Sequence, residues 1–457
     1  MAFPVKCCLL TVSASSWFVQ LVRIAPGLSM GTVDARDLGL DWSPNPCGLA
    51  RSDRFDVVLV SSDWYKWLAA RHPDRVDPVF ERLRRMADRI VALEGHDLFS
   101  LSLPPGALDR VDLVLKGQGI YRDRELYNYR VGPFFAGANW TAAIESRRVR
   151  YTHAQLEKLR LSVPCFLAID ARTRHRIRLV ERPHRRLETY ARLAAEAAVQ
   201  ASLPLVRLRR PKHLTAHFVG TLTHRQRLDL LEILRSAGVP GSQAITRVPE
   251  DFYGTGALER SDTRDRPGPV EERLEEHDLR TPPPEEDPAE PGDPPALVTA
   301  DGVAVRVPPQ TVRALGEALR RSNLGSPPMS RPAFTRSLAR SGVVLAPAGF
   351  GEITFRHAEA FIVRRPLICQ DLSHVETMYP FADRHNAIFC RPDLTDVAGI
   401  LREVERGDIP ADEIAGQGQR CWRDWLAGGQ RLLHRGITGH LEERGDPYPR
   451  MTPAAAA

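Results

Sequence analysis

Short apolar runs alternate with longer amphipathic stretches in the first half of the chain. Four runs have the length and the β-branched content of buried strands: 55–60 (FDVVLV), 90–93 (IVAL), 111–116 (VDLVLK) and 163–170 (VPCFLAID). Ahead of the second run, Asp77 and Pro78 are predicted to be the N-cap and the first residue of a helix. Residues 186–201 are a second helix candidate. Short strands that alternate with amphipathic helices indicate a parallel sheet with both faces covered.

The same alternation starts again near residue 215. A strand at 215–220 (TAHFVG) precedes a helix in which Thr223 and Gln226 have capping-box spacing and Gly238 marks the end. The remaining expected elements are a helix at 310–321, a strand at 343–346, a helix that begins near Thr354, a strand at 366–370, a helix at 393–405 and a helical segment at 411–441. The pattern predicts an α/β protein with two Rossmann-like domains that face a central cleft, a common place for a substrate site.

An acidic, Pro-rich segment interrupts the second half. Residues 260–296 hold nine prolines, twelve acidic and five basic side chains, and few large apolar groups to offset the entropy of ordering. We expect a disordered insertion there. The predicted organisation is a partly unstructured N-terminal extension at 1–52, Rossmann-like domains at 53–205 and 213–410 with a linker near 200–212, the disordered insertion at 250–300, a helical segment at 411–445 and a tail at 446–457.

The charge balance narrows the classes of partner. The formal charge is +6, and because residues 260–296 carry −7, the rest of the 457-residue chain carries +13. A basic body suits nucleic acid, a membrane surface or small anionic substrates. The basic segments 171–186 and 207–213 contain no aromatic side chain that could stack on a base, so nucleic-acid binding is not expected.

Cysteine content and the N-terminus bear on the compartment. The seven cysteines are an odd number without a C-x-x-C pair, which indicates reduced thiols in a cytoplasmic protein and no zinc finger. Residues 7–22 are too short and too polar to span a bilayer, so an unstructured extension ahead of a start at Met30 is favoured over a signal or anchor. No integral membrane segment is expected. The aspartates of DRVDP and DRVDL lie at expected element starts and predict no metal site.

The stretch 343–360 (VVLAPAGFGEITFRHAEA) has the strongest candidate chemistry. A strand leads into a glycine loop that lets a ligand approach the backbone, and the next helix directs its first N–H groups at that loop. Such a joint favours phosphate, which Arg356 and His357 would reinforce, while Glu359 could accept hydrogen bonds from ribose or sugar hydroxyls. The loop is neither a Walker P-loop nor a G-x-G-x-x-G fingerprint. The alternative is an ordinary glycine turn with two solvated glutamates, Glu352 and Glu359.

This region also resembles a known family. The block 345–381 (LAPAGFGEITFRHAEAFIVRRPLICQDLSHVETMYPF) is similar to the C-terminal half of group 1-like glycosyltransferases of the two-Rossmann GT-B fold, in the bacterial branch that also resembles exostosin-type transferases. The matching positions are Pro347, Gly349, Gly351, Glu352, Arg356, Glu359, Ala360, Asp371, Ser373, His374, Glu376 and Thr377. Two further segments look like parts of the family, 217–234 with Gly220, Arg225 and Arg227, and 111–129 with Lys116, Tyr121 and Arg122 to Arg124. The resemblance spans about 55–240 and 303–405.

The resemblance implies a nucleotide-diphosphate sugar as donor, with no cofactor and no metal. Glu359 would hold the ribose, Glu352 the sugar hydroxyls, and Arg225 or Arg227 the diphosphate. The loop residues Gly349, Phe350, Gly351 and Thr354 would add their amides, and Gly220, Arg356, Asp371, His374 and Glu376 would complete the substrate site. Many retaining members space their glutamates as E-x7-E, whereas six residues separate Glu352 from Glu359, which leaves the role of Glu352 and the stereochemistry open.

The catalytic residues are the least defined part. His96 and Asp97 follow a predicted strand and could act as a general base, as could Glu352, although a histidine in a loop is usually structural. His374 is expected to contact the donor or its diphosphate, or else to hold its own loop. The expected function is transfer of a hexose-type sugar to an unknown hydroxyl acceptor. An epimerase or hydrolase of nucleotide sugars and a non-catalytic interaction protein are the alternatives.

Overall fold

The computed structural model describes most of the two α/β regions. The described residues are 5–11, 28–34, 54–94, 103–117, 119–128, 151–162, 214–221, 226–241, 243–247, 326–349, 352–377 and 380–438, with isolated positions elsewhere. Residues up to 203 are called the first half below, and residues from 214 the second half.

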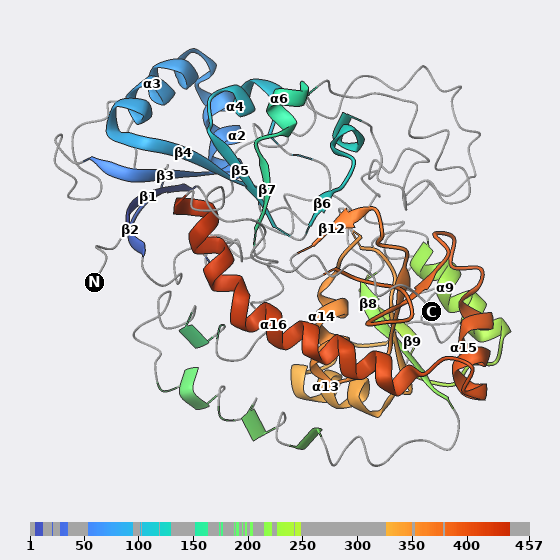
Figure 1. The fold of residues 1–457 in the computed structure, drawn as a ribbon. Coiled ribbons are helices and arrows are strands. Elements are labelled where there is room, and N and C mark those ends of the chain that lie inside the picture. Colours follow the sequence, from blue (N-terminus) through green and yellow to red (C-terminus); the bar gives the residue numbers. More distant parts are fainter. Residues whose placement is uncertain are drawn as a thin grey trace, which may run out of the picture.

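The first half is built on a sheet of six parallel strands (Figure 1). The strands are β1 (Val5–Thr11), β2 (Leu28–Asp34), β3 (Phe55–Ser61), β4 (Ala87–Glu94), β5 (Leu113–Lys116) and β7 (Leu159–Leu161), in the order β2-β1-β3-β4-β5-β7. The strands predicted at 55–60, 90–93 and 111–116 are confirmed as β3, β4 and β5. The candidate at 163–170 lies outside the described residues.

The extreme N-terminus corrects the sequence-based expectation. A partly unstructured extension outside the Rossmann-like domain was expected over 1–52, yet β1 lies inside the sheet, parallel to β2 on one side and β3 on the other. Cys7, Cys8, Leu9 and Leu10 are all buried. An interior parallel strand is covered on both faces, so four consecutive apolar residues suffice for it.

Helices cover the faces of this sheet. They are α2 (Ser62–Arg71), α3 (Val76–Met86), α4 (Pro105–Asp109) and α6 (His153–Leu156), with 3₁₀ turns η1 (Pro73–Arg75) and η2 (Arg124–Asn128). Asp77 was expected to cap α3, but the helix begins at Val76, directly after η1. The Asp77 carboxylate instead accepts a hydrogen bond from Arg110 Nε at 2.8 Å, which fastens α3 to the segment before β5.

The second half contains five parallel strands. They are β8 (Ala216–Thr221), β9 (Gln243–Arg247), β10 (Val343–Ala346), β11 (Leu367–Gln370) and β13 (Ile388–Cys390), in the order β13-β11-β10-β8-β9. In both sheets the first strand therefore lies between the second and the third. This order reverses direction between the first and third strands, which are β8 and β10 here. Open parallel sheets bind ligands at such a switch point, beyond the carboxyl ends of the strands.

The helices of the second half are α9 (Gln226–Ser236), α13 (Arg331–Arg340), α14 (Phe355–Ile362), α15 (Val397–Arg406) and α16 (Ala411–Thr438). The expected helix after Thr354 is confirmed, with Thr354 in extended conformation as its N-cap. The expected strands at 343–346 and 366–370 and the final helical segment are confirmed as well.

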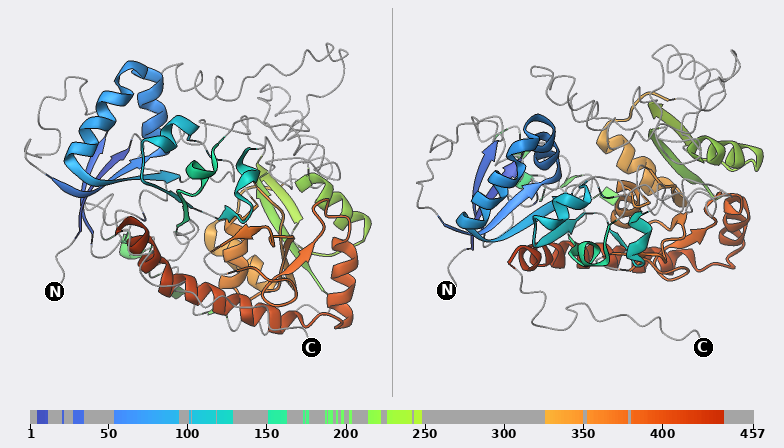
Figure 2. Two further views of the ribbon diagram at one scale, coloured as in Figure 1. Left: turned by 45° about the horizontal axis from the view of Figure 1, so that its top comes forward. Right: turned by 90° about the horizontal axis from the view of Figure 1, so that it is seen from above.

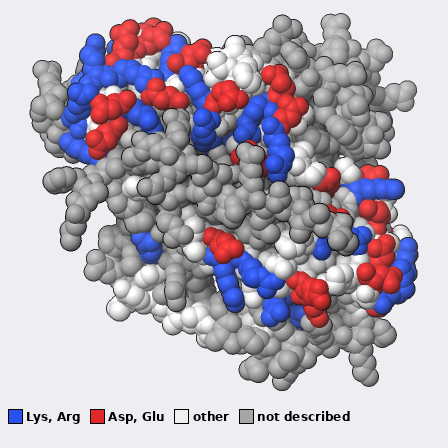
Figure 3. Space-filling view, in the orientation of Figure 1, with Lys and Arg blue, Asp and Glu red and all other residues white. Residues whose placement is uncertain are grey.

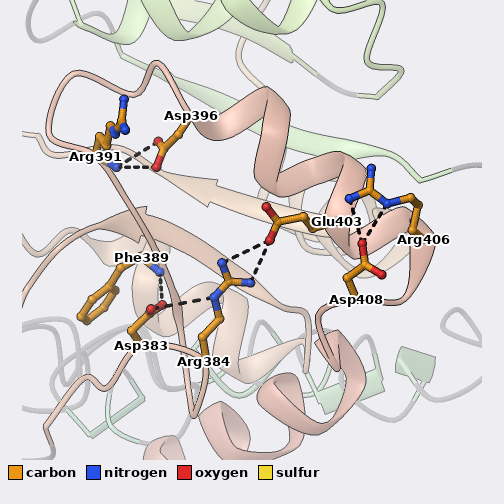
Figure 4. A network of polar contacts seen from close by, with 8 residues as sticks. All are labelled: Asp383, Arg384, Phe389, Arg391, Asp396, Glu403, Arg406 and Asp408. Atoms are coloured by element: carbon orange, nitrogen blue, oxygen red, sulfur yellow. Dashed lines mark hydrogen bonds and ion pairs between the residues drawn. The ribbon is translucent and has the colours of Figure 1, made fainter.

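The helix expected at 393–405 begins four residues later, for a local reason. Leu394 has a left-handed φ of 64°, which cannot continue a helix of L residues. The Asp396 carboxylate turns back to accept from the Arg391 N–H at 3.0 Å. Figure 4 shows this contact beside the Arg384–Glu403 pair, which ties the turn before β13 to α15.

Two features connect the halves. β6 (Ile120–Tyr121) pairs antiparallel with β12 (Val375–Glu376), so a segment that follows β5 lies against the loop after β11. Helix α16 runs from beside α14 to the first sheet (Figures 1 and 2). Its buried Leu433 and Ile437 belong to the same apolar cluster as the core of the first sheet.

Gly418 allows α16 to lie close to α14. A Cβ at this position would lie 2.5 Å from a ring carbon of Phe361 and 3.1 Å from the Asn386 carbonyl oxygen. We expect Gly418→Ala to lower the free energy of unfolding by about 1–2 kcal/mol, because overpacking outweighs the better helix propensity of alanine. Gly399→Ala on α15 is the matched control, since its Cβ would meet nothing within 4 Å, and it should stabilise by about 0.5–1 kcal/mol. Urea unfolding measures both, and equal stabilisation by the two changes would contradict this packing.

Charges on the first half are mixed in sign. Figure 3 shows Lys and Arg side chains interspersed with Asp and Glu over α3 and its neighbours. Three ion pairs join them, Arg54–Asp88, Arg84–Asp112 and Arg110–Asp77. Exposed pairs of this kind contribute about 0–1 kcal/mol each. The described part of this face is therefore not a uniformly basic patch.

Several expectations fall outside the described residues. They concern most of the helix at 186–201, the linker near 200–212, the helix at 310–321, the insertion at 250–300 and the tail at 446–457. The five described cysteines are buried and form no disulfide, as expected for them: Cys7, Cys8, Cys369, Cys390 and Cys421. None of the described helices is both long and apolar enough to cross a bilayer.

Candidate functional site

The predicted phosphate-binding joint lies at the switch point of the second sheet. β8 ends at Thr221 and the adjacent β10 ends at Ala346, from which Pro347, Ala348 and Gly349 continue toward α14. Gln370, at the end of β11, holds this loop, because its Oε1 accepts from the Ala348 N–H at 2.8 Å and its Nε2 donates to the Pro392 carbonyl. The loop position is thus set by the neighbouring strand.

Arg227 joins the two sides of the switch point. It is buried in the first turn of α9, where Nε donates to the Ala348 carbonyl at 3.0 Å and Nη1 to the Thr221 carbonyl at 2.6 Å. A Cβ on Gly349 would lie 2.9 Å from Arg227 Nη2, so the glycine is needed for space. Gly220 leaves more room, with its nearest Arg227 atom at 3.8 Å from such a Cβ.

Arg356 lies in the first turn of α14 and faces the end of β8. Its Nη2 donates to the Val219 carbonyl and its guanidinium lies over the Phe334 ring, 4.7 Å from the centroid. Nε pairs with Glu359 Oε2 at 3.2 Å, and both side chains are only 14% exposed. The alternative of a solvated Glu359 is therefore wrong. Burial, followed by the positive charge of Arg356, lowers the pKa of Arg227 to about 9.

Two neutral histidines line the same region. Burial, followed by the charge of Arg356, lowers the pKa of His217 to about 3. Burial chiefly lowers the pKa of His357 to about 3 as well, against a hydrogen bond with Thr354. The expected role of His357 in reinforcing phosphate binding stays a prediction; its Nδ1 accepts from the Thr354 N–H at 3.1 Å and caps the helix. The positive charge of the joint therefore comes from the arginines.

Glu352 forms a second, separate cluster. Its side chain is fully buried, with Oε1 at 3.1 Å from His374 Nε2 and at 3.3 Å from the donating Tyr121 hydroxyl. Oε2 is buried and has no hydrogen-bond partner among the described residues. The alternative of a solvated glutamate is wrong for Glu352 too. His374 lies close enough to Glu352 to hold it, so the two residues expected at the donor site do meet.

The first half contributes to this cluster through β6. Tyr121 stacks on His374 with ring centroids 6.0 Å apart, and Arg122 Nε donates to the Ser373 carbonyl at 2.9 Å. Arg124 Nη2 donates to Glu376 Oε2 at 3.0 Å. Glu376 thus binds a side chain of the first half, while Asp371 closes its own turn by accepting from the Ser373 N–H. The site roles expected for Glu376 and Asp371 remain predictions.

Sequence reasoning gave Tyr121 and Lys116 no role of their own. Lys116 is fully buried at the carboxyl end of β5, and its charge acts on Glu352. Lys116 ends an apolar run that was predicted to be a strand, and Tyr121 follows it. Polar side chains beyond the carboxyl end of a parallel strand commonly bind ligands, and this position could have identified both residues from the sequence. His96, Asp97, Arg225, Phe350 and Gly351 lie outside the described residues. Within the described ranges, no group of three or more His, Cys, Asp or Glu side chains is arranged to hold a metal.

Glu352 gives protein stability a defined pH dependence. Burial raises the pKa of Glu352, against the opposing effects of His374, Tyr121 and Lys116. The folded state therefore holds the proton more tightly than the unfolded chain, in which a glutamate has a pKa of about 4.3. The resulting stabilisation is complete below that value and is lost as pH rises through the raised pKa of the folded state.

We expect wild type to lose stability relative to Glu352→Gln as pH rises above about 4.3, by up to about 1.4 kcal/mol per pH unit. Urea unfolding of both proteins across a pH series measures this difference. Parallel stability profiles would show that burial does not govern the titration of this group.

Comparison with known proteins adds broad structural likenesses. No protein-family model and no curated protein matches this chain. The structure is similar to Anabaena Alr3699/HepE in complex with UDP-glucose, at 12% identity over 96% of this chain and 100% of that chain, with a TM-score of 0.41. It is also similar to UDP-GlcNAc 2-epimerase from Neisseria meningitidis bound to UDP-GlcNAc, at 8% identity over 95% and 99% of the two chains, with a TM-score of 0.34. These superpositions are loose, and the function proposed below is inferred from the residues of this chain.

Proposed function

We propose that this protein is a glycosyltransferase of the GT-B type that takes a sugar from a nucleoside-diphosphate sugar and transfers it to a hydroxyl acceptor. The observation that carries the proposal is the pair Arg227 and Arg356 at the β8–β10 switch point, where Arg227 is buried and donates to two backbone carbonyls and Arg356, only 14% exposed, pairs with Glu359. Buried charge is costly unless it is paired. An anion that binds there would neutralise the excess positive charge.

The joint fits a diphosphate in particular. The positive end of the α14 dipole adds to the two arginines, and Gly349 leaves space for close approach to the backbone. Glu359, already oriented by Arg356, has a second oxygen that could accept from ribose hydroxyls. Glu352 would accept from a hydroxyl of the sugar through Oε2. The donor would thus extend from the arginines toward the Glu352 cluster.

Catalysis would depend on the charge that develops on the departing diphosphate. Fixed cations and a helix N-terminus stabilise such charge without reorganisation, so the proposed reaction requires no metal. His374 lies beside Glu352 and could hold or transfer a proton at Nε2. The acceptor and the choice between retention and inversion are not assigned.

Product analysis tests the proposed reaction. The full-length protein is incubated with UDP-glucose, GDP-mannose or ADP-glucose, with and without a mixture of simple sugar acceptors, and its products are separated by chromatography. Transfer predicts release of nucleoside diphosphate together with a glycosylated acceptor, reduced by Glu359→Ala. Release of free sugar without any transfer would indicate a hydrolase. An altered nucleotide sugar that keeps its diphosphate would indicate an epimerase, and no turnover would support a non-catalytic protein.

A further inference from the structure

A tyrosine of the first half reaches the carboxylate proposed to bind the sugar. The Tyr121 hydroxyl donates to Glu352 Oε1 at 3.3 Å, although 231 residues separate the two in sequence. The same Oε1 lies 3.1 Å from His374 Nε2, whereas no described residue forms a hydrogen bond with the buried Oε2. Two groups therefore fix one oxygen of the carboxylate, and the other is directed away from them.

The position of Tyr121 is itself fixed by several contacts. Its strand β6 pairs with β12, in which Tyr121 is opposite Val375. The Tyr121 N–H donates to the Tyr127 hydroxyl at 3.1 Å, and the Arg122 N–H donates to the His374 carbonyl at 3.0 Å. The tyrosine ring stacks on His374 at an interplanar angle of 27°. Because backbone and ring are both held, the hydroxyl has little freedom to leave Glu352.

We propose that Tyr121 is a positioning residue for sugar recognition, which holds Glu352 Oε1 so that Oε2 accepts from a hydroxyl of the donor sugar. The inference rests on the function proposed above. It means that the first half of the chain contributes to recognition of the donor sugar. Burial raises the pKa of Glu352, and the positive charge of the buried Lys116 is among the effects that oppose this rise.

The hydroxyl of Tyr121 is suited to donate throughout the neutral range. Burial, followed by the negative charge of Glu352, raises the pKa of Tyr121 well above its ordinary value. The phenol therefore keeps its proton beside the carboxylate. A phenylalanine would preserve the ring stacking on His374 and remove the hydroxyl that donates to Glu352, so the substitution tests the positioning effect.

A double-mutant cycle on binding tests this inference. Affinities of the full-length protein for UDP and UDP-glucose, GDP and GDP-mannose, and ADP and ADP-glucose are measured by calorimetry for wild type, Tyr121→Phe, Glu352→Gln and the double variant. We expect Tyr121→Phe to weaken binding of the nucleotide sugar about three- to tenfold, the range of a typical single hydrogen bond, and to change the affinity for the matching nucleoside diphosphate less than twofold. In the Glu352→Gln variant, Tyr121→Phe should cause no further loss of affinity for the nucleotide sugar, because Tyr121 acts through the Glu352 carboxylate.

Tyr151→Phe provides the matched control. Tyr151 is another buried tyrosine of the first half, and its hydroxyl donates to the Leu103 carbonyl at 2.7 Å. Its loss should lower stability without changing either affinity. If nucleoside diphosphate binds but the effects of Tyr121→Phe and Glu352→Gln are additive, the positioning role is wrong and the proposed function stands. If no nucleoside diphosphate binds, the proposed function fails, and this inference with it.

Discussion

Arg227→Met is expected to lower the affinity for the nucleoside diphosphate about 10- to 100-fold. The side chain is buried between the carbonyls of Thr221 and Ala348, so it is oriented before any ligand arrives. Loss of a preoriented cation removes one or more charge-assisted hydrogen bonds to phosphate, each worth about 1.5–3 kcal/mol, and every 1.4 kcal/mol is about tenfold in affinity. Calorimetric titration of wild type and variant measures this loss.

The same change should also destabilise the fold, which needs a separate control. Two buried carbonyls lose their donor, at a cost of about 1–3 kcal/mol, so circular dichroism and urea unfolding must show that the variant is folded at the temperature of the titration. Arg336→Met on α13 is the matched control, because Arg336 is exposed. It should change neither the affinity for the nucleoside diphosphate nor the free energy of unfolding. If the folded Arg227→Met protein binds the nucleoside diphosphate as tightly as wild type, Arg227 does not take part in binding it.

Glu352→Gln is expected to reduce kcat/KM for the nucleotide sugar about 100- to 1000-fold. The substitution keeps the shape and one acceptor oxygen but removes the negative charge between His374 and Tyr121. The range is that of losing a positioned charged or proton-transferring group in a water-poor site. Steady-state rates with the nucleotide sugar that turns over in wild type measure it, while nucleoside diphosphate affinity should stay within twofold.

Glu403→Gln on α15 serves as the control for this change. Glu403 pairs with the exposed Arg384 in the network of Figure 4, outside both clusters of the site. Its loss should leave kcat/KM unchanged. A Glu352→Gln protein with wild-type kcat/KM would reduce Glu352 to a buried structural acceptor.

Much of the fold was predictable because local pattern dominates in parallel sheets. β3, β4, β5, β10 and β11 are continuous apolar runs bounded by polar residues, and such runs are buried in any parallel arrangement. β1 and β2 were not predicted, because residues 1–52 were assigned to a partly unstructured N-terminal extension. The start of α15 was predicted four residues too early because Leu394 has a left-handed backbone conformation, which a leucine in the sequence does not predict.

The site was predictable in part for a similar reason. A glycine loop between a strand and a helix identified Gly349, Arg356 and Glu359 as neighbours, since these residues are close in sequence. The burial of Glu352 depends instead on Tyr121, and the orientation of Arg356 depends on Val219, 137 residues earlier. No local pattern contains such contacts. Because of these long-range contacts, Glu352 and Glu359 lie in two largely buried clusters and are not solvated.

The central claim is that a nucleoside diphosphate binds at the β8–β10 switch point. Isothermal titration of the full-length protein with UDP, GDP and ADP tests it most directly, with Arg227→Met and Arg336→Met titrated in parallel. The account predicts that at least one of the three nucleotides binds to wild type and Arg336→Met with a Kd below about 1 mM, the upper end of usual substrate affinities, and that Arg227→Met weakens this binding about 10- to 100-fold. Absence of binding by all three nucleotides, or equal binding by the folded Arg227→Met protein, would contradict it.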